Sequence, residues 1–224
     1  PFMPGDSEID AQAFDFLIDS DDRTTLFSTP NMPVVLQDHF IGLHASTLVR
    51  DGGTLQIGIG SMGDALTAAL LARQADSAGY RALLAEMDLA PWQALIDREG
   101  GVEPFAKGLY GCSEMFVNGL LVLVDAGIVR RKVYPDEARQ AQANAGTLDE
   151  AAQADGVSVH GGFFLGPRTF YERVRELPQA KRGEFNMTAI SYINELYGQE
   201  PLKRLQRLDA RFINSAITVT LLGA

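Results

Sequence analysis

Two segments of this sequence carry the side chains with the clearest chemical potential, and the first is rich in glycine. Residues 58–63 read GIGSMG, fit the pattern G-x-G-x-x-G and directly follow an apolar run at 54–57. Glycines let the backbone approach a ligand closely, and the N–H groups of a helix that begins there carry partial positive charge. The segment therefore predicts either a site for an anionic group or a tight strand-to-helix turn without a ligand.

The same loop could also belong to a dinucleotide site, which requires a second strand that ends in an acidic residue about twenty positions further on. Residues 80–88 read YRALLAEMD, and they contain neither Val nor Ile. This composition favours a helix over a strand. Glu86 is therefore a poor candidate for a ribose ligand, and a nicotinamide-dependent oxidoreductase is an alternative that depends on the glycine loop alone.

The second segment contains Glu114, between a strand-like run at 109–113 and an apolar, helix-like run at 115–128. Ligands of α/β proteins bind where strands end and helices begin. A carboxylate at that point can act as a base or a nucleophile. It can also simply complement the dipole at the start of a helix, so both interpretations stay open on spacing alone.

Other reactive side chains are scattered. Cys112 could be a thiol nucleophile, but the sequence shows no clear histidine partner, which favours a small buried side chain. His39, His44 and His160 form no compact motif, so we expect no metal site. The basic run RRK at 130–132 could meet ligand phosphates, although short basic runs are typical of solvated surfaces.

The composition bounds the class of protein. The chain has 224 residues, of which 46% are hydrophobic, and a net charge of −10. The chain is long and apolar enough to form a packed domain, and its composition excludes a disordered protein. The acidic balance makes a nucleic-acid partner a poor expectation. One cysteine excludes a disulfide framework, and no run suits a membrane span or a signal peptide, so we expect a cytoplasmic protein without a membrane partner.

The elements that must position these residues alternate between strand-like and helix-like segments. This pattern predicts an α/β fold, a mostly parallel open sheet with flanking helices. Strands are expected at 54–59, 109–113, 161–165 and 212–222, and helices at 34–50, 64–75, 115–128 and 168–177. A helical insertion is expected at 76–106, a polar surface excursion at 135–156, and an acidic connector or arm at 1–33 with one short helix around 11–18.

Three motifs in order resemble the acetyl-CoA hydrolase/transferase family, the CoA-transferases that include 4-hydroxybutyrate, butyrate and succinyl-CoA:acetate enzymes. They are LQIGIG at 55–60, SEM at 113–115 with GL at 119–120 and DAGI at 125–128, and FINSA at 212–216. The match covers residues 34–224 and corresponds to the C-terminal catalytic half of such enzymes. It implies that this chain is a fragment of a longer polypeptide, an expectation that the missing initial methionine and the final strand-like run also favour.

The resemblance implies an acyl-CoA:carboxylate CoA-transferase. Glu114 would form a covalent glutamyl-CoA thioester. The residues that would contact CoA are Gly58, Ile59, Gly60, Ser61, Met62 and Asn214. Coenzyme A or acyl-CoA and a short carboxylic acid would be substrates, no cofactor would be bound permanently, and the protein would be a homo-oligomer, most simply a dimer.

The sequence also departs from the family pattern. Cys112-Ser113 replaces the usual pair before the glutamate, in which Thr often follows His or Tyr, and Gly63 stands where the loop usually continues into Pro. Two alternatives accompany the transferase: an acetyl-CoA or acyl-CoA hydrolase on the same scaffold, and a non-catalytic CoA-binding domain.

Overall fold

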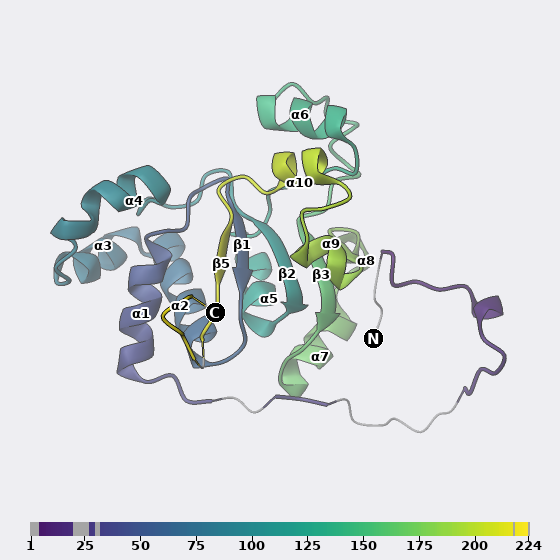
Figure 1. The fold of residues 1–224 in the computed structure, drawn as a ribbon, viewed down its shortest axis with the longest axis horizontal. Coiled ribbons are helices and arrows are strands. Elements are labelled where there is room, and N and C mark those ends of the chain that lie inside the picture. Colours follow the sequence, from purple (N-terminus) through teal and green to yellow (C-terminus); the bar gives the residue numbers. More distant parts are fainter. Residues whose placement is uncertain (1–4, 20–26, 30–31, 217, 224) are drawn as a thin grey trace.

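One parallel sheet organises the chain. The computed structural model describes residues 5–19, 27–29, 32–216 and 218–223. In this part of the chain five strands form a sheet in the order β4-β3-β2-β1-β5, and each neighbouring pair is parallel (Figure 1). The strands are β1 (Thr54–Ile57), β2 (Tyr110–Phe116), β3 (Val159–Phe164), β4 (Phe185–Met187) and β5 (Arg211–Ile213). The expected α/β class is confirmed.

Helices connect the strands, because parallel neighbours need crossover connections. The helices of the described residues are α1 (Leu36–Ser46), α2 (Ser61–Ala75), α3 (Ser77–Ala85), α4 (Gln93–Glu99), α5 (Asn118–Asp125), α6 (Glu137–Ala145), α7 (Arg168–Glu176), α8 (Gln179–Arg182), α9 (Ile190–Asn194) and α10 (Glu200–Gln206), with 3-10 turns η1 (Ala11–Ala13) and η2 (Ala90–Trp92).

The core lies mainly on one face of the sheet. Leu66 and Leu70 of α2 and Leu120 of α5 are fully buried in one cluster with side chains of β1–β4 and α7. A smaller cluster joins Tyr110 and Cys112 of β2 to residues that include Ile193 of α9. Since alternate residues of a strand point to opposite faces, α9 covers the face opposite α5.

The expected helical insertion at 76–106 consists of α3, η2 and α4. The buried guanidinium of Arg73, at the end of α2, attaches this region to the body. It donates hydrogen bonds to three backbone carbonyls, those of Ser46 (3.2 Å), Val49 (2.7 Å) and Glu103 (2.6 Å). Its central carbon also lies 4.2 Å from the centre of the Phe105 ring. Burial lowers the pKa of Arg73, and the carbonyls supply the partners that this buried cation needs.

Glu114 lies inside β2 and not after it. The sequence predicts a strand over 109–113 and a helix from 115, whereas β2 continues to Phe116 and α5 begins at Asn118. The reason is the β2–β3 ladder, which pairs Met115 with Phe163 and Phe116 with Phe164 and so keeps the backbone extended. The interpretation of Glu114 as a helix-start residue is therefore wrong.

The prediction of a long final strand at 212–222 is also wrong. β5 contains only Arg211–Ile213, and no further strand follows among residues 214–216 and 218–223. β5 is an edge strand whose one neighbour, β1, ends at Ile57 and turns away at the glycine loop, so no strand lies beside the described residues after Ile213 to extend the ladder. The apolar side chains of Val219, Leu221 and Leu222 are exposed. Ile217 lies outside the described residues.

Smaller differences concern element ends and the N-terminal arm. The first strand ends at Ile57, two residues early, and α2 begins at Ser61 instead of position 64. Of the helix expected around 11–18, only the turn η1 forms, and parts of the predicted connector, 1–4, 20–26 and 30–31, lie outside the described residues. Elements β4, α6, α8, α9 and α10 were not expected; α6 lies within the predicted polar excursion at 135–156. Within the described ranges, no helix is long and apolar enough to cross a membrane.

Candidate active site

Three of the sequence motifs meet at the end of the sheet where the carboxyl ends of the strands lie. Gly58 follows β1, and its N–H donates to the carbonyl of Ile213 at the end of β5 (3.0 Å), which places Asn214 beside it. A Cβ added at Gly58 would lie 2.7 Å from Oδ1 of Asn214. On the other side of β1, the register of the β1–β2 ladder, when continued, brings Glu114 level with Gly58. The glycine loop, the glutamate and the asparagine therefore occupy the carboxyl ends of adjacent strands.

Gly60 and Gly63 are glycines for two different structural reasons. Gly60 has a φ of +102°, which strains any other residue, and it immediately precedes α2. Gly63 lies against the strand end, because a Cβ there would be 2.2 Å from the carbonyl oxygen of Gly58. Ser61 is half-buried and Met62 is only 9% exposed, so the side chain of Met62 belongs to the protein interior.

A small cleft opens beside the loop, with about 40 Å³ of internal space. Its walls come from three strand-to-helix turns and from the segment that precedes α1: Gly58, Ile59, Gly60, Gly63 and Asp64; Val117, Asn118 and Gly119; Leu165, Gly166 and Pro167; Thr29 and Met32, together with Ile57. Of the residues predicted to contact CoA, only Gly58, Ile59 and Gly60 line this cleft. Ser61, Met62, Asn214 and the carboxylate of Glu114 do not.

The electrostatics of the cleft favour an anion. Helices α2, α5 and α7 all begin at the carboxyl ends of the strands. Their unpaired N–H groups and the positive ends of their dipoles therefore converge on the cleft. The one carboxylate in the lining belongs to Asp64 in the first turn of α2, and its partial burial raises its pKa. A phosphate or carboxylate group fits this arrangement better than a cation does.

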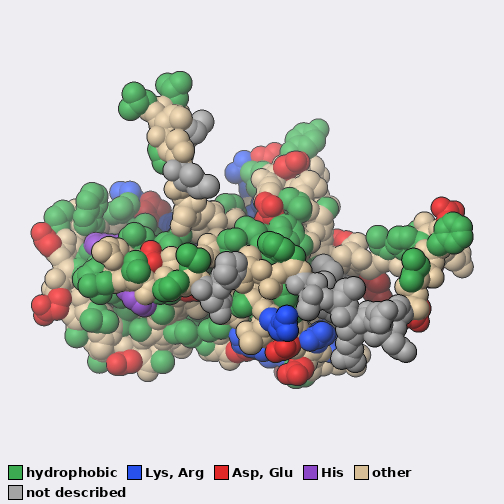
Figure 2. Space-filling model, turned by 90° about the horizontal axis from the view of Figure 1, so that it is seen from below, with side chains coloured by type: hydrophobic (Ala, Val, Ile, Leu, Met, Phe, Trp, Pro, Cys, Tyr) green, Lys and Arg blue, Asp and Glu red, His purple; other side chains and the backbone are tan. Residues whose placement is uncertain are grey.

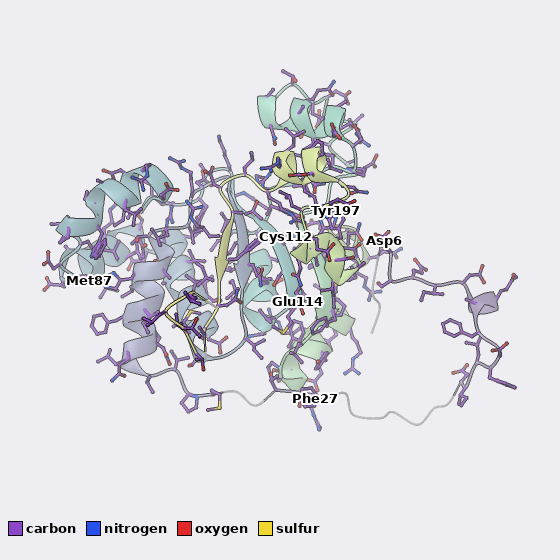
Figure 3. The ribbon with its side chains drawn as sticks, in the orientation of Figure 1. Asp6, Phe27, Met87, Cys112, Glu114 and Tyr197 are labelled. Carbon is purple, nitrogen blue, oxygen red and sulfur yellow. The ribbon has the colours of Figure 1, made fainter. Side chains whose placement is uncertain are left out.

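The carboxylate of Glu114 is held by a residue that the sequence analysis did not select. Nδ2 of Asn194, the last residue of α9, donates to Oε2 of Glu114 at 2.6 Å. Figure 3 shows Glu114 on β2, below Cys112 and under α9. Glu114 is half-buried, and within the described part of the chain it forms no ion pair, so its second oxygen is not neutralised by a cation. No local pattern marks Asn194, because it lies 80 residues from its partner.

The neighbours of Glu114 leave its side chain accessible from one face. Ser113 points to the other face, where its hydroxyl donates to the carbonyl of Met115 (2.7 Å) and is buried. On β3, a Cβ at Gly162 would lie 2.8 Å from the carbonyl oxygen of Glu114, so this position accepts only glycine without rearrangement. The hydroxyl that the sequence retains before the glutamate therefore has a backbone partner and does not contact the carboxylate.

Cys112 has a histidine neighbour after all, but the buried environment of its thiol disfavours a reactive thiolate. The β2–β3 ladder pairs Cys112 with His160, but Nδ1 of that histidine is hydrogen-bonded to the phenol oxygen of Tyr110 at 2.7 Å. Burial raises the pKa of the Cys112 thiol and lowers the pKa of His160 to about 4. At neutral pH the pair is a buried thiol and a neutral imidazole, whereas a reactive cysteine requires a thiolate.

The basic run at 130–132 lies at the other end of the sheet. Arg130 donates to the carbonyls of Phe105 and Ala106, and Arg131 donates to Thr54, the first residue of β1. The Lys132 ammonium contacts carbonyls near residue 153. These cations stabilise loops at the amino ends of the strands and do not reach the cleft.

Residues 80–88 do not form the second strand that a dinucleotide site requires. Residues 77–85 form α3, and Glu86 caps the carboxyl end of that helix, so no strand runs through 80–88. His39 and His44 lie on α1, away from the cleft, and no group of three or more potential metal ligands occurs within the ranges that the structure describes.

The comparisons with known proteins show the fold. No protein-family model and no curated protein matches the chain. The structure is similar to RipA from Yersinia pestis, with a TM-score of 0.52, 17% identity and coverage of 91% of this chain and 33% of that one. A glutamate-to-aspartate mutant of RipA matches with a TM-score of 0.52, 16% identity and coverage of 91% and 33%.

A third solved structure, a 4-hydroxybutyrate CoA-transferase from Porphyromonas gingivalis, matches with a TM-score of 0.49, 20% identity and coverage of 87% of this chain and 35% of that one. The chain thus spans about a third of the length of the solved proteins it resembles.

Proposed function

We propose that this chain carries the catalytic glutamate of an acyl-CoA:carboxylate CoA-transferase, with Glu114 as the nucleophile. The observation that supports this most directly is the position of Glu114: level with the glycine loop, half-exposed, free of any ion pair in the described residues, and oriented by Asn194. Glutamate carboxylates are ionised at neutral pH, so such a residue needs no general base to attack a carbonyl.

The proposed reaction has two exchange steps. A carboxylate oxygen of Glu114 attacks the thioester carbonyl carbon of acyl-CoA, the C–S bond breaks, and a mixed anhydride forms as CoA leaves as a thiolate. The thiolate then attacks the glutamyl carbonyl carbon and the C–O bond to the acyl group breaks. This releases the first carboxylic acid as its carboxylate and leaves a glutamyl-CoA thioester. An incoming carboxylate reverses both steps and departs as the new acyl-CoA.

Asn194 would act during the second step. When the thiolate attacks, negative charge develops on the glutamyl oxygen that remains, and an N–H donor already placed on that oxygen stabilises it. The 2.6 Å bond from Asn194 to Oε2 leaves the other oxygen, Oε1, for the attack on the substrate. Asn194 is thus the donor that both orients the nucleophile and serves its tetrahedral intermediate.

CoA would bind along the carboxyl edge of the sheet. The cleft at Gly58–Gly60 offers three helix N-termini to an anionic part of the molecule, and Asn214 lies beside Gly58 with its side chain exposed. The proposal needs no resident cofactor, because CoA and acyl-CoA are substrates. The acceptor would be a short carboxylic acid.

The experiment uses the full-length protein, acetyl-CoA and a panel of short carboxylates. Acyl exchange is measured first, and the enzyme is then treated with borohydride or hydroxylamine and mapped by mass spectrometry. We expect the modification on Glu114, and we expect Glu114→Gln to lose exchange by at least about 10³-fold while retaining CoA binding, because an amide is a poor nucleophile. Glu172→Gln, an exposed glutamate on α7, serves as the matched control and should exchange normally.

The same assay separates the alternatives. Release of free CoA without an acceptor acid measures hydrolysis, in which water replaces the acceptor. CoA binding without exchange and without a trapped thioester would support the non-catalytic domain. A label on Cys112, or near-normal turnover of Glu114→Gln, would refute the glutamyl mechanism.

A further inference from the structure

The N-terminal arm, defined here as residues 5–19, is attached at its root and then leaves the body, to which the chain returns at Phe27 and Thr29. At the root, the N–H of Ser7 donates to the carbonyl of Met187 (3.1 Å), and the hydroxyl of Thr188 donates to Oδ2 of Asp6 (2.8 Å). Both partners belong to β4 or the residue after it, so the arm starts at the β4 edge of the sheet. Beyond Ser7 it extends away from the sheet and carries η1 near its far end (Figure 1).

The outer part of the arm exposes a cluster of large apolar side chains. Phe16 is 88% exposed and Ile18 is 94% exposed. The full set is Ile9, Phe14, Phe16, Leu17 and Ile18. Exposed apolar residues are normal when they are single, but a contiguous group on a projecting segment marks an interaction surface. Asp10 and Asp15 lie between these apolar residues, and residues 5–19 contain no Lys or Arg.

An apolar groove lies at the opposite end of the molecule. It runs between α1, α2 and α3 and encloses about 390 Å³. Its lining is mostly aliphatic and aromatic, and it includes Leu36, Phe40, Leu43, Ala68, Leu83 and Met87. Leu36 is 68% exposed, so the described residues leave this part of the groove uncovered. Figure 2 shows hydrophobic side chains gathered at the α1–α3 end and again on the arm at the other end.

We infer that the arm of one copy of this chain binds in the groove of a second copy, and that two copies exchange arms reciprocally. The arm leaves from the β4 edge, whereas the groove lies beyond the β1–β5 edge, so the two surfaces face away from each other within one chain. Two copies that lie side by side and antiparallel bring each arm to the partner's groove. This gives a closed twofold pair.

The apolar area is sufficient for a stable pair. The five arm side chains, and Leu36, Phe40 and Leu83 of the groove, are each about half exposed to fully exposed. A fully exposed apolar side chain has a surface of about 150 Å². One arm in one groove would then bury about 800 Å², and the reciprocal pair about 1,600 Å², which is the size of a standard specific interface. A short partner peptide would cover the groove but would leave the arm exposed, whereas a second copy covers both.

The first test measures mass in solution by analytical ultracentrifugation over a range of concentrations. We expect a monomer–dimer equilibrium for the native chain. Phe16→Asp with Ile18→Asp on the arm, and Ala68→Glu in the groove, should each weaken dimerisation at least about tenfold. Val219→Asp replaces an exposed apolar residue outside both surfaces and should leave the equilibrium unchanged. Circular dichroism melts verify that the variants are folded.

The second test identifies the contact, and it uses the fact that the native Cys112 is buried. A copy with Phe16→Cys is mixed with a copy that has Ala68→Cys and is mildly oxidised. We expect a covalent heterodimer, and we expect none when Val219→Cys replaces the groove cysteine. Two outcomes of the first test would overturn the inference: a monomer at every concentration, or a dimer that tolerates the arm and groove variants. A third would come from one chain that carries both Phe16→Cys and Ala68→Cys: a disulfide within that chain instead of between two chains.

Discussion

Asn194 and Glu114 are joined by a hydrogen bond of 2.6 Å from Nδ2 to Oε2, although α9 and β2 are remote in sequence. The bond fixes one carboxylate oxygen and leaves the other available. It therefore gives the candidate nucleophile a defined orientation, and it makes Asn194 the first residue to test beside the glutamate itself.

Replacing Asn194 should lower turnover more than substrate affinity. We expect Asn194→Ala to reduce kcat about 10²-fold with a small change in KM, because the lost donor acts on developing charge and not on bound CoA. Asn194→Asp should be at least as harmful, since it places a second carboxylate against Glu114. Steady-state kinetics measures both. Asn144, an asparagine that donates to the carbonyl of Leu205 far from the site, is the control, and Asn144→Ala should not change kcat.

The two glycines that flank the start of α2 should respond differently to a side chain. At Gly60 nothing lies within 4 Å of an added Cβ, so Gly60→Ala meets only the strain of a φ of +102°, about 1 kcal/mol of unfolding free energy. At Gly63 an added Cβ would lie 2.2 Å from a backbone oxygen, so Gly63→Ala should cost at least about 2 kcal/mol. Urea unfolding compares the two, and equal losses would contradict the packing argument.

For CoA binding, a bulkier side chain at Gly60 is the sharper test. Gly60→Val should weaken the affinity for CoA at least about tenfold, because it blocks the approach of a ligand to the loop backbone. Isothermal titration with CoA measures the effect. Unchanged affinity in a folded variant would move the CoA site away from this loop.

Arg73 should be one of the most sensitive positions for stability. Arg73→Met preserves the bulk but leaves the carbonyls of Ser46, Val49 and Glu103 without their donor, and we expect a loss of about 3 kcal/mol. Arg81 forms an exposed ion pair with Glu103, and Arg81→Met should cost less than about 1 kcal/mol. The difference in urea midpoint between the two variants checks this contrast.

Stability should fall as the pH decreases, with a contribution from His160. Burial lowers its pKa to about 4 in the folded chain, while an exposed histidine titrates near 6.5. Between these values the unfolded chain binds a proton that the folded chain does not, so unfolding becomes easier as the pH falls from about 6.5 toward 4, by up to about 3 kcal/mol.

Unfolding free energies at several pH values, from 7 down to 4.5, measure this slope. His160→Gln should flatten it, whereas His39→Gln, which changes an exposed histidine, should retain it. An identical slope in all three proteins would show that His160 does not contribute.

Local patterns were enough to predict much of the fold. The GIGSMG turn, the helix after it and the helical character of 76–106 depend on glycine content and on residue propensity within one segment, and the structure contains each of them. The prediction failed where neighbours decide. Glu114 is in a strand because β3 pairs beyond it, and residues 214–216 and 218–222 are not, because β1 has already ended.

The sequence by itself determined which residues could do chemistry: a glycine loop before a helix, a lone glutamate and an asparagine, each on its own apolar segment. Only the tertiary structure decided that these three ends adjoin, that Asn194 holds Glu114, and that the histidine paired with Cys112 is buried and neutral. The physical reason is that periodicity and propensity act within a few residues. Strand order, register and burial, in contrast, arise from contacts between segments that are distant in the chain, and no local pattern encodes them.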